Sequence, residues 1–86
     1  MSAPVLVSLG HETGTTVIDA REVLREAFKA QANAIIVAHN HPSGNLAPSM
    51  ADIETTKELQ SLFDRFGVEF IDHLIIGKSG FRSILA

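Results

Sequence analysis

The hydrophobic positions of this chain fall into short continuous runs and helical stripes, and these two patterns predict its elements. The apolar run at residues 5–9 predicts a strand. Turn-forming residues at 10–14 and a β-branched run at 15–18 predict that this strand continues into a hairpin. A continuous apolar run at 34–38 predicts a strand that is buried on both faces.

Two amphipathic stripes predict one helix before that buried strand and one after it. The first helix is expected to begin after Asp19, which an acidic residue follows three positions later, and to end near Asn33. The second is expected to begin after Ser49 and to stop at Gly67. The predicted inner faces are Val23, Leu24, Ala27 and Phe28 in the first helix, and Ile53, Thr56, Leu59, Leu62, Phe63 and Phe66 in the second.

The last part of the chain predicts two more strands. Residues 68–76 are typical of a strand that Asp72 and His73 interrupt. Gly and Ser at 77–80 predict a turn, and residues 81–85 a final strand. Strands that alternate with helices indicate a layered α/β domain.

Composition limits the kind of core and the kind of site. Eighty-six residues suit one domain with a modest core, and 45% hydrophobic against 20% charged residues excludes a largely disordered chain. The core must be mostly aliphatic, because the chain has no Trp or Tyr and five Phe. With no cysteine, disulfides and thiolate metal sites are excluded, so nitrogen and oxygen ligands remain.

Charge and hydropathy argue against two classes of partner. The net charge is −3 and the pI about 5.7. Arg21, Arg25 and Lys29 recur every fourth residue, but Glu22 and Glu26 lie among them, so this helix face is predicted to be solvated and nucleic-acid binding through this chain is not expected. No apolar run approaches the roughly 20 residues that cross a membrane, and the N-terminus lacks a signal-peptide pattern, so we expect a cytoplasmic location.

The candidate chemistry lies where the buried strand ends. Side chains alternate along a strand, so His39 and His41 point to the same side, and residues 41–44 then fit a type I turn. With the carboxylate of Asp52, two imidazoles supply three ligands of a catalytic zinc site whose fourth position stays open. The alternative is that both histidines are hydrogen-bonded structural residues without a metal.

Ser49 and Asp52 also have structural interpretations. Asp52 is the third residue of the second helix, where a capping box and the helix dipole favour a carboxylate. The helix N-terminus would keep Asp52 ionised, as a metal ligand must be. Ser49 is most simply the N-cap, but its hydroxyl can accept from the helix and still donate outward to an oxyanion.

The spacing of these residues forms a known motif. It reads His-x-His-Pro, six residues, Ser, two residues, Asp, with His39, His41, Pro42, Ser49 and Asp52 at its fixed positions. This resembles the motif of the JAMM (MPN+) metalloproteases. The wider text HNHPSG, PSMADIETT and IDHLIIG resembles the RadC-like branch of that superfamily, from about residue 7 to residue 83.

The resemblance implies a fold and an activity. The fold would be a cytidine-deaminase-like α/β (JAB/MPN) domain over residues 1–86, three-layer-like, with a mixed sheet and two main helices. Zn²⁺ would be held by His39, His41 and Asp52 with water as its remaining ligand, and Ser49 would help to hold the oxyanion. The implied reaction is hydrolysis of an amide or isopeptide bond in a peptide substrate. RadC-like proteins carry a DNA-repair label, but these residues do not indicate a repair chemistry.

One part of the JAMM pattern is not found. The family uses an upstream glutamate as general base, which is typically worth ~10²–10⁴ in rate, and the strands that would carry it are absent, so the domain is expected to be N-terminally truncated. Glu12 is a weak candidate, because it sits in a turn one residue off the usual loop length. Glu22 and Glu26 belong to the solvated helix face, and Glu69 opens a later strand. The missing strands would leave a sheet edge that a second copy of the chain could cover as a homodimer.

Other interpretations stay open. Asp72 and His73 could form a buried Asp–His hydrogen bond or support a metal ligand from behind, whereas His11 receives no role. The chain could be a binding or scaffolding module, with or without metal, that has lost the general base. It could also be a nucleic-acid-associated module, against which the acidic pI argues.

Overall fold

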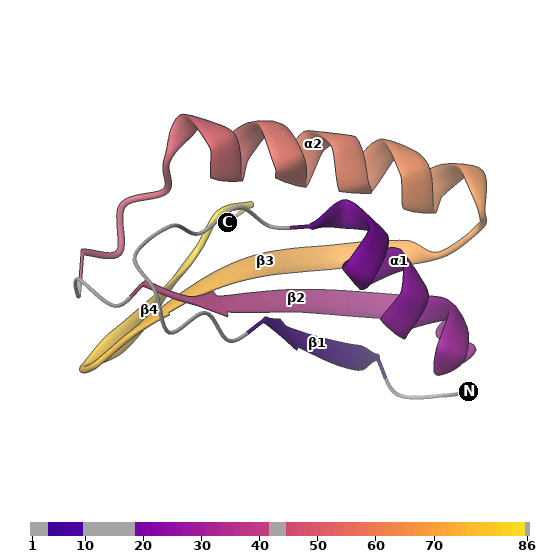
Figure 1. Ribbon diagram of the computed structural model, residues 1–86, viewed down its shortest axis with the longest axis horizontal. Coiled ribbons are helices and arrows are strands. Elements are labelled where there is room, and N and C mark those ends of the chain that lie inside the picture. The colour runs from indigo at the N-terminus through magenta and orange to yellow at the C-terminus, as the bar shows by residue number, and fades with distance from the viewer. Residues whose placement is uncertain (1–3, 10–18, 42–44, 86) are drawn as a thin grey trace.

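The computed structural model describes residues 4–9, 19–41 and 45–85, and these form a four-stranded sheet with two helices (Figure 1). In chain order the elements are β1 (Val5–Leu9), α1 (Ala20–Lys29), β2 (Ala34–Asn40), α2 (Met50–Arg65), β3 (Glu69–Gly77) and β4 (Gly80–Ser83). The strands lie in the order β1-β2-β3-β4; the first three are parallel and β4 is antiparallel to β3. The predicted mixed sheet with two main helices is therefore confirmed. The rest of the predicted hairpin, at 10–18, and most of the predicted turn at 41–44 lie outside the described residues.

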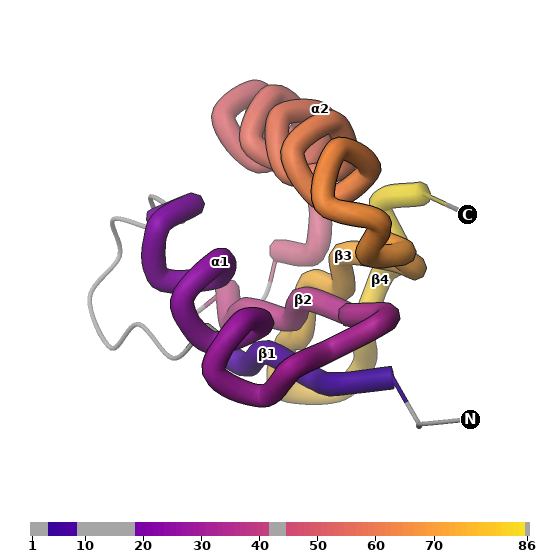
Figure 2. Tube along the Cα trace, turned by 90° about the vertical axis from the view of Figure 1, so that its right-hand side faces the viewer, coloured from indigo at the N-terminus to yellow at the C-terminus, as the bar shows by residue number. Residues whose placement is uncertain are grey.

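Both helices pack on the same face of the sheet, as the end-on view shows (Figure 2). Right-handed crossovers that step across a sheet in one direction place successive helices on one face. Phe28 of α1 and Phe66 of α2 meet edge to face with ring centroids 5.2 Å apart. The described elements therefore make two layers, and the expected third layer has no counterpart among them. Leu6 and Phe81, on the opposite face, are exposed.

The core lies between the helices and the sheet and is almost entirely aliphatic, as predicted. Its buried members are Val7, Val23, Ala27, Ile35, Val37, Leu59, Phe63 and Val68. Phe28 and Phe66 were expected on the inner helix faces, but they are 48% and 57% exposed. They lie in the last turn of α1 and just past the end of α2, where they pack on each other. None of the described helices is long and apolar enough to cross a membrane.

Helix α1 ends at Lys29, four residues before the expected end. Gln31 adopts a left-handed backbone with φ of 53°, which stops the helix. Its N–H donates to the carbonyl of Phe28 at 3.0 Å, and the N–H of Ala32 donates to the carbonyl of Ala27 at 3.0 Å. This pair of bonds is the Schellman motif, which a glutamine rarely forms, so the sequence carried no clear stop signal.

Helix α2 ends as predicted. Gly67 has a φ of 72°, and its N–H donates to the carbonyl of Asp64 at 3.2 Å. The N–H of Val68 donates to the carbonyl of Phe63 at 2.9 Å, which completes the same motif. A glycine is suited to this conformation because it has no Cβ.

Strand β3 runs without a break through Asp72 and His73, so the predicted interruption is wrong. The irregularity is one residue earlier: Ile35 of β2 pairs with Phe70, and the next residue of β2 pairs with Asp72, which leaves Ile71 as an extra residue. Because faces alternate along a strand, this bulge places both Phe70 and His73 on the side of the helices. Asp72 then points to the opposite side.

Strand β4 is shorter than expected, since it ends at Ser83 rather than at residue 85. The N–H of Ile84 still donates to the carbonyl of His73 at 2.9 Å. The next N–H, of Leu85, donates to the side chain of Asp72 at 3.3 Å and not to the strand. At this end of the sheet the carboxylate of Asp72 thus replaces a backbone carbonyl as the hydrogen-bond acceptor.

Candidate metal centre

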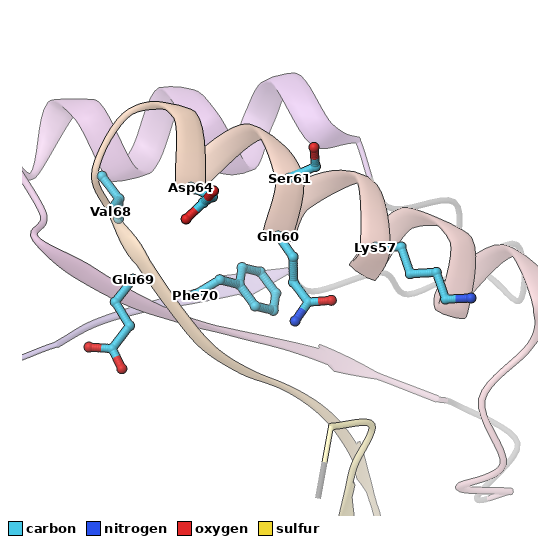
Figure 3. A pocket seen from close by; sticks show the side chains of 7 residues that line it. All are labelled: Lys57, Gln60, Ser61, Asp64, Val68, Glu69 and Phe70. Atoms are coloured by element: carbon cyan, nitrogen blue, oxygen red, sulfur yellow. The ribbon is translucent and has the colours of Figure 1, made fainter.

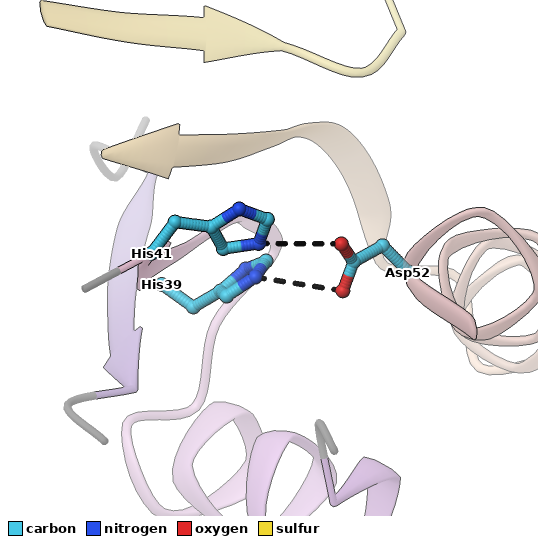
Figure 4. Close-up of side chains that lie close together, drawn as sticks. All are labelled: His39, His41 and Asp52. Atoms are coloured by element: carbon cyan, nitrogen blue, oxygen red, sulfur yellow. Dashed lines mark ion pairs between the residues drawn. The ribbon is translucent and has the colours of Figure 1, made fainter. Parts of the chain in front are cut away.

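The structure brings His39, His41 and Asp52 together where β2 ends and α2 begins (Figure 4). Nε2 of His39 lies 3.5 Å from Oδ1 of Asp52, and Nε2 of His41 lies 3.3 Å from Oδ2. One ligand atom from each of the three residues lies within 4.8 Å of the other two. Among the residues that the structure describes, this is the one group of three or more His, Asp or Glu side chains with such spacing.

Strand β2 positions both histidines. Ile35 and Val37 point into the core, and by alternation His39 follows them on the same face at the edge of that core, where it is buried. The N–H of His41 donates to the carbonyl of Ile76 at 3.0 Å, so the residue just past β2 is still aligned with β3. The side chain of His41 is 12% exposed, although its Nε2 is buried.

Helix α2 positions the carboxylate through its N-cap. The hydroxyl of Ser49 accepts from the N–H of Asp52 at 3.0 Å, and Oδ2 of Asp52 accepts from the N–H of Ser49 at 2.8 Å. This is the predicted capping box, formed in full. The oxygen that Ser49 holds, Oδ2, faces His41, and the other oxygen, Oδ1, faces His39.

Hydrogen-bond chemistry gives His41 a lone pair that faces Asp52. Nδ1 of His41 lies 2.8 Å from the carbonyl oxygen of Asn45, and a carbonyl only accepts, so Nδ1 carries the proton and a neutral ring has its lone pair at Nε2. Nε2 of His41 and Oδ1 of Asp52 are buried and have no hydrogen-bond partner among the described residues. Electron-rich atoms that face one another in a buried space are unfavourable unless a metal ion or a proton lies between them.

The spacing of these atoms fits a small divalent cation. Zinc bonds to imidazole nitrogen and carboxylate oxygen of about 2.0–2.2 Å, in tetrahedral geometry, place neighbouring ligand atoms about 3.3–3.5 Å apart. Each oxygen of Asp52 lies near this distance from one histidine: Oδ1 is 3.5 Å from Nε2 of His39, and Oδ2 is 3.3 Å from Nε2 of His41. The residues present therefore fit a metal by donor type, by the gathering of one ligand atom from each within 4.8 Å and, at His41, by protonation.

His73 lies behind His39: it contacts Nδ1 of that ring, whereas Nε2 of the same ring faces Asp52. Its Nε2 is 2.7 Å from Nδ1 of His39, and its Nδ1 is 2.6 Å from the hydroxyl of Thr56. Burial, together with the neighbouring His39, lowers the pKa of His73 from 6.5 to about 4, so the ring is neutral at pH 7. Of the two roles considered for this histidine, support of a metal ligand agrees with these contacts.

The alternative, a buried hydrogen bond between the Asp72 and His73 side chains, is wrong. Asp72 points away from the helices, because the bulge at Ile71 puts it on the opposite face of β3 from His73. Its carboxylate accepts from the backbone N–H of His73 at 2.7 Å and from the hydroxyl of Ser83. Asp72 therefore joins β3 to the end of β4.

Thr56 was expected only as a member of the inner helix face. It is buried, and its hydroxyl lies 2.7 Å from the carbonyl oxygen of Asp52 as well as beside His73. The available signal was its position four residues after Asp52, which puts both on one face of α2. Its partner on β3 could not be identified without the strand register.

No described glutamate joins the cluster. Glu26 and Glu69 are exposed, Glu22 is half-buried, and none belongs to the group that could hold a metal. Glu12 lies outside the described residues, as does His11. The three cations of α1 are all exposed: Arg21, Arg25 and Lys29. The predicted solvated face of this helix is therefore confirmed.

A separate open hollow of about 620 Å³ lies beside the second half of α2 and the start of β3 (Figure 3). It is lined by Lys57, Gln60, Ser61, Asp64, Val68, Glu69 and Phe70. At 1.5 Å rise per residue, Asp64 lies roughly 18 Å along the helix from Asp52. The metal candidate and this hollow are thus at different ends of α2, and no residue belongs to both.

Comparison with known proteins identifies the family of this chain. The family model of the RadC-like JAB domain matches residues 4–86. The chain is 51% identical over 63 residues to a UPF0758 protein of Actinobacillus pleuropneumoniae serotype 5b, which covers 73% of this chain and 29% of that protein. It is 46% identical over 71 residues to a UPF0758 protein of Staphylococcus haemolyticus, covering 83% of this chain and 31% of that protein.

A more distant relative extends the match along the chain. A UPF0758 protein of Thermosynechococcus vestitus is 39% identical over 79 residues, which is 92% of this chain and 31% of that protein. The chain thus spans less than a third of the length of the curated relatives it matches. Because the family model covers nearly all of it, the chain belongs to the RadC-like JAB domain family.

Proposed function

We propose that this domain is a zinc-dependent hydrolase of the JAMM type that cleaves amide or isopeptide bonds in peptide substrates. The observation that carries the proposal is that His39, His41 and Asp52 place their ligand atoms together in a buried space, at separations that suit one cation. Zinc in such a site supplies Lewis acidity to a carbonyl group and acidifies water. The side chain of His41 is 12% exposed, so the site lies near the surface although Nε2 itself is buried.

Ser49 would bind the oxyanion that develops on the substrate. Its hydroxyl oxygen accepts from the N–H of Asp52, and no acceptor among the described residues takes the hydroxyl proton. Ser49 is exposed and is held by the capping box within one turn of the carboxylate. A fixed donor beside the ligands is what oxyanion stabilisation requires.

A second candidate function rests on the general base. Because no described glutamate lies with the three ligands, the same metal site could serve a binding or scaffolding module that holds zinc without hydrolysis. The two functions make the same prediction for metal content and opposite predictions for peptide cleavage.

The first experiment measures zinc per chain by elemental analysis of protein without a polyhistidine tag. We expect about one zinc in the parent and none in Asp52→Ala or His41→Ala. Glu54→Ala is the matched control, because it removes an exposed carboxylate from the same turn of α2 and should retain the metal. A parent that stays free of zinc after zinc is supplied would exclude both candidate functions.

The second experiment separates the two candidates by assaying zinc-loaded protein on peptide and isopeptide substrates. A hydrolase should lose all activity in Asp52→Ala and about 10²–10³-fold in Ser49→Ala, which retains zinc but lacks the oxyanion donor. Full zinc occupancy without cleavage of any substrate would favour the binding module. Cleavage that survives in Asp52→Ala would point to a contaminating enzyme.

A further inference from the structure

A continuous chain of buried hydrogen bonds runs from the backbone of α2 to the first candidate ligand. The hydroxyl of Thr56 lies 2.7 Å from the carbonyl oxygen of Asp52 and 2.6 Å from Nδ1 of His73. Nε2 of His73 lies 2.7 Å from Nδ1 of His39. All four residues are buried, so water does not compete for these contacts.

The proton positions along this chain follow from one acceptor that cannot donate. The carbonyl of Asp52 only accepts, so the single proton of the Thr56 hydroxyl must point to it; otherwise two oxygens would lie 2.7 Å apart with no proton between them. The oxygen of Thr56 must then accept from Nδ1–H of His73. A neutral His73 therefore has its lone pair at Nε2.

The next bond transmits that choice to His39. Because Nε2 of His73 accepts, Nδ1 of His39 must donate, which leaves the lone pair of His39 at Nε2. That atom faces Oδ1 of Asp52 at 3.5 Å. The opposite tautomer would direct a proton into the space where the three candidate ligands meet and would have to be lost before a metal could bind.

We propose that Thr56 and His73 are positioning residues that hold His39 in its Nδ1–H tautomer, ready for a metal at Nε2 before the metal arrives. The proposal rests on the proposed metal site for its purpose, but the tautomer is a property of the metal-free protein. His41 reaches the same tautomer by a single bond to the carbonyl of Asn45. The two ligands thus receive matching orientation from different parts of the fold.

The test reads the tautomer of His39 directly, by ¹⁵N NMR of the imidazole rings in metal-free protein at pH 7.5. The parent should show a protonated Nδ1 and an unprotonated Nε2. Thr56→Val removes the hydroxyl with little change in volume, so His73 loses the acceptor that orders it and His39 should become a mixture of tautomers. Thr56→Ser keeps the hydroxyl and should retain the parent signals.

A second pair of variants covers the case in which Thr56→Val does not fold. His73→Leu removes the acceptor for Nδ1–H of His39 and should also mix the tautomers. His73→Gln offers an amide oxygen to His39 and an amide N–H to Thr56, so it should rescue the parent tautomer. Either pair alone decides the outcome.

Zinc affinity, measured by competition with a chelator, gives the second readout. Loss of a residue that orients a metal-bound histidine typically weakens binding 10–100-fold, so we expect that loss in Thr56→Val and His73→Leu and no more than a few-fold change in the rescued variants. A His39 that stays fully Nδ1–H in either loss variant that folds would overturn the inference. If the parent bound no zinc but showed the tautomer and its loss, the inference would stand and the proposed function would fail.

Discussion

The two halves of the interface between α2 and the sheet are built from opposite kinds of side chain. At the end where α2 finishes, the helix presents Leu59 and Phe63 to the aliphatic core. At the end where it begins, the same helix face presents Asp52 and Thr56 to the imidazoles of the sheet. Both halves are equally buried.

This difference separates what folds the domain from what it is proposed to do. Buried apolar side chains stabilise the folded state at about 25 cal/mol per Å² of surface removed from water. Buried polar groups stabilise it little, and they are tolerated only when each has a partner. The apolar half of the interface between α2 and the sheet thus stabilises the fold, and this stability can offset the cost of burying polar side chains in the other half.

The largest expected effect comes from the apolar half. Phe63→Ala should lower the free energy of unfolding by about 3–5 kcal/mol, because it removes a fully buried ring and leaves a cavity. Zinc affinity of the protein that remains folded should change by less than about threefold. Urea unfolding and a zinc titration well below the transition measure the two quantities.

Phe66→Ala is the control for that substitution, since Phe66 is 57% exposed and its loss should be much less destabilising. Zinc affinity that falls together with stability in Phe63→Ala would show that the two halves are not independent.

The next effect is a pH dependence that belongs to the polar half. The ring of His73 takes up a proton near pH 6.5 in the unfolded chain but only near pH 4 in the folded protein. Between these values the unfolded state binds more protons, so the metal-free protein should lose roughly 3 kcal/mol of stability as the pH falls through this window. Above pH 6.5 this contribution is complete and does not change further.

His73→Gln should lack that part of the pH dependence, because an amide does not titrate. The quantity to compare is the slope of unfolding free energy against pH in the two proteins, both in the presence of a chelator. Parallel profiles from pH 4 to 7 would mean that His73 is not held neutral in the fold.

The smallest expected change in stability accompanies the largest change in metal binding. Asp52→Asn keeps an acceptor for the N–H of Ser49 and places an amide N–H₂ near Nε2 of His39. That gain offsets the loss of a charge at a helix N-terminus, which is worth about 0.3–1 kcal/mol, so metal-free stability should change by less than about 1 kcal/mol while zinc binding is lost. Thermal unfolding with a chelator and a zinc titration test both parts.

Glu54→Gln removes one exposed charge from the same turn and should leave both properties intact. If Asp52→Asn instead lowered the free energy of unfolding of the metal-free protein by several kcal/mol, the carboxylate would contribute to folding as well as to metal binding. Such a loss would show that protonated histidines, rather than a cation, satisfy the carboxylate.

The predicted features that the structure confirms depend on side chains close in sequence. The capping box of Ser49 and Asp52 spans three residues, and Gly67 ends its helix through its own backbone. The two histidines could be placed on one side because alternation in a strand is a local rule. The end of α1 was missed because Gln31 adopts a conformation that usually requires glycine.

The contacts that could not be predicted depend on strands being in a particular register. His73 meets His39 only because β3 lies parallel to β2 with one extra residue at Ile71. Regular alternation after Phe70 would have turned His73 to the open face and directed Asp72 at the helices. The sequence contains no marker for this bulge, since Ile71 is an ordinary strand residue.

The bulge also affects how this segment should be aligned with its relatives. Ile71 is about 37% exposed and has no partner in β2, so a strand that lacked it would pair regularly and would keep Phe70, Asp72 and His73 on their present faces. A single-residue gap in this region therefore belongs at position 71, where it moves no side chain of the site. Placed anywhere from His73 onward, the same gap would pair the imidazole of one protein with a residue on the opposite face of the other.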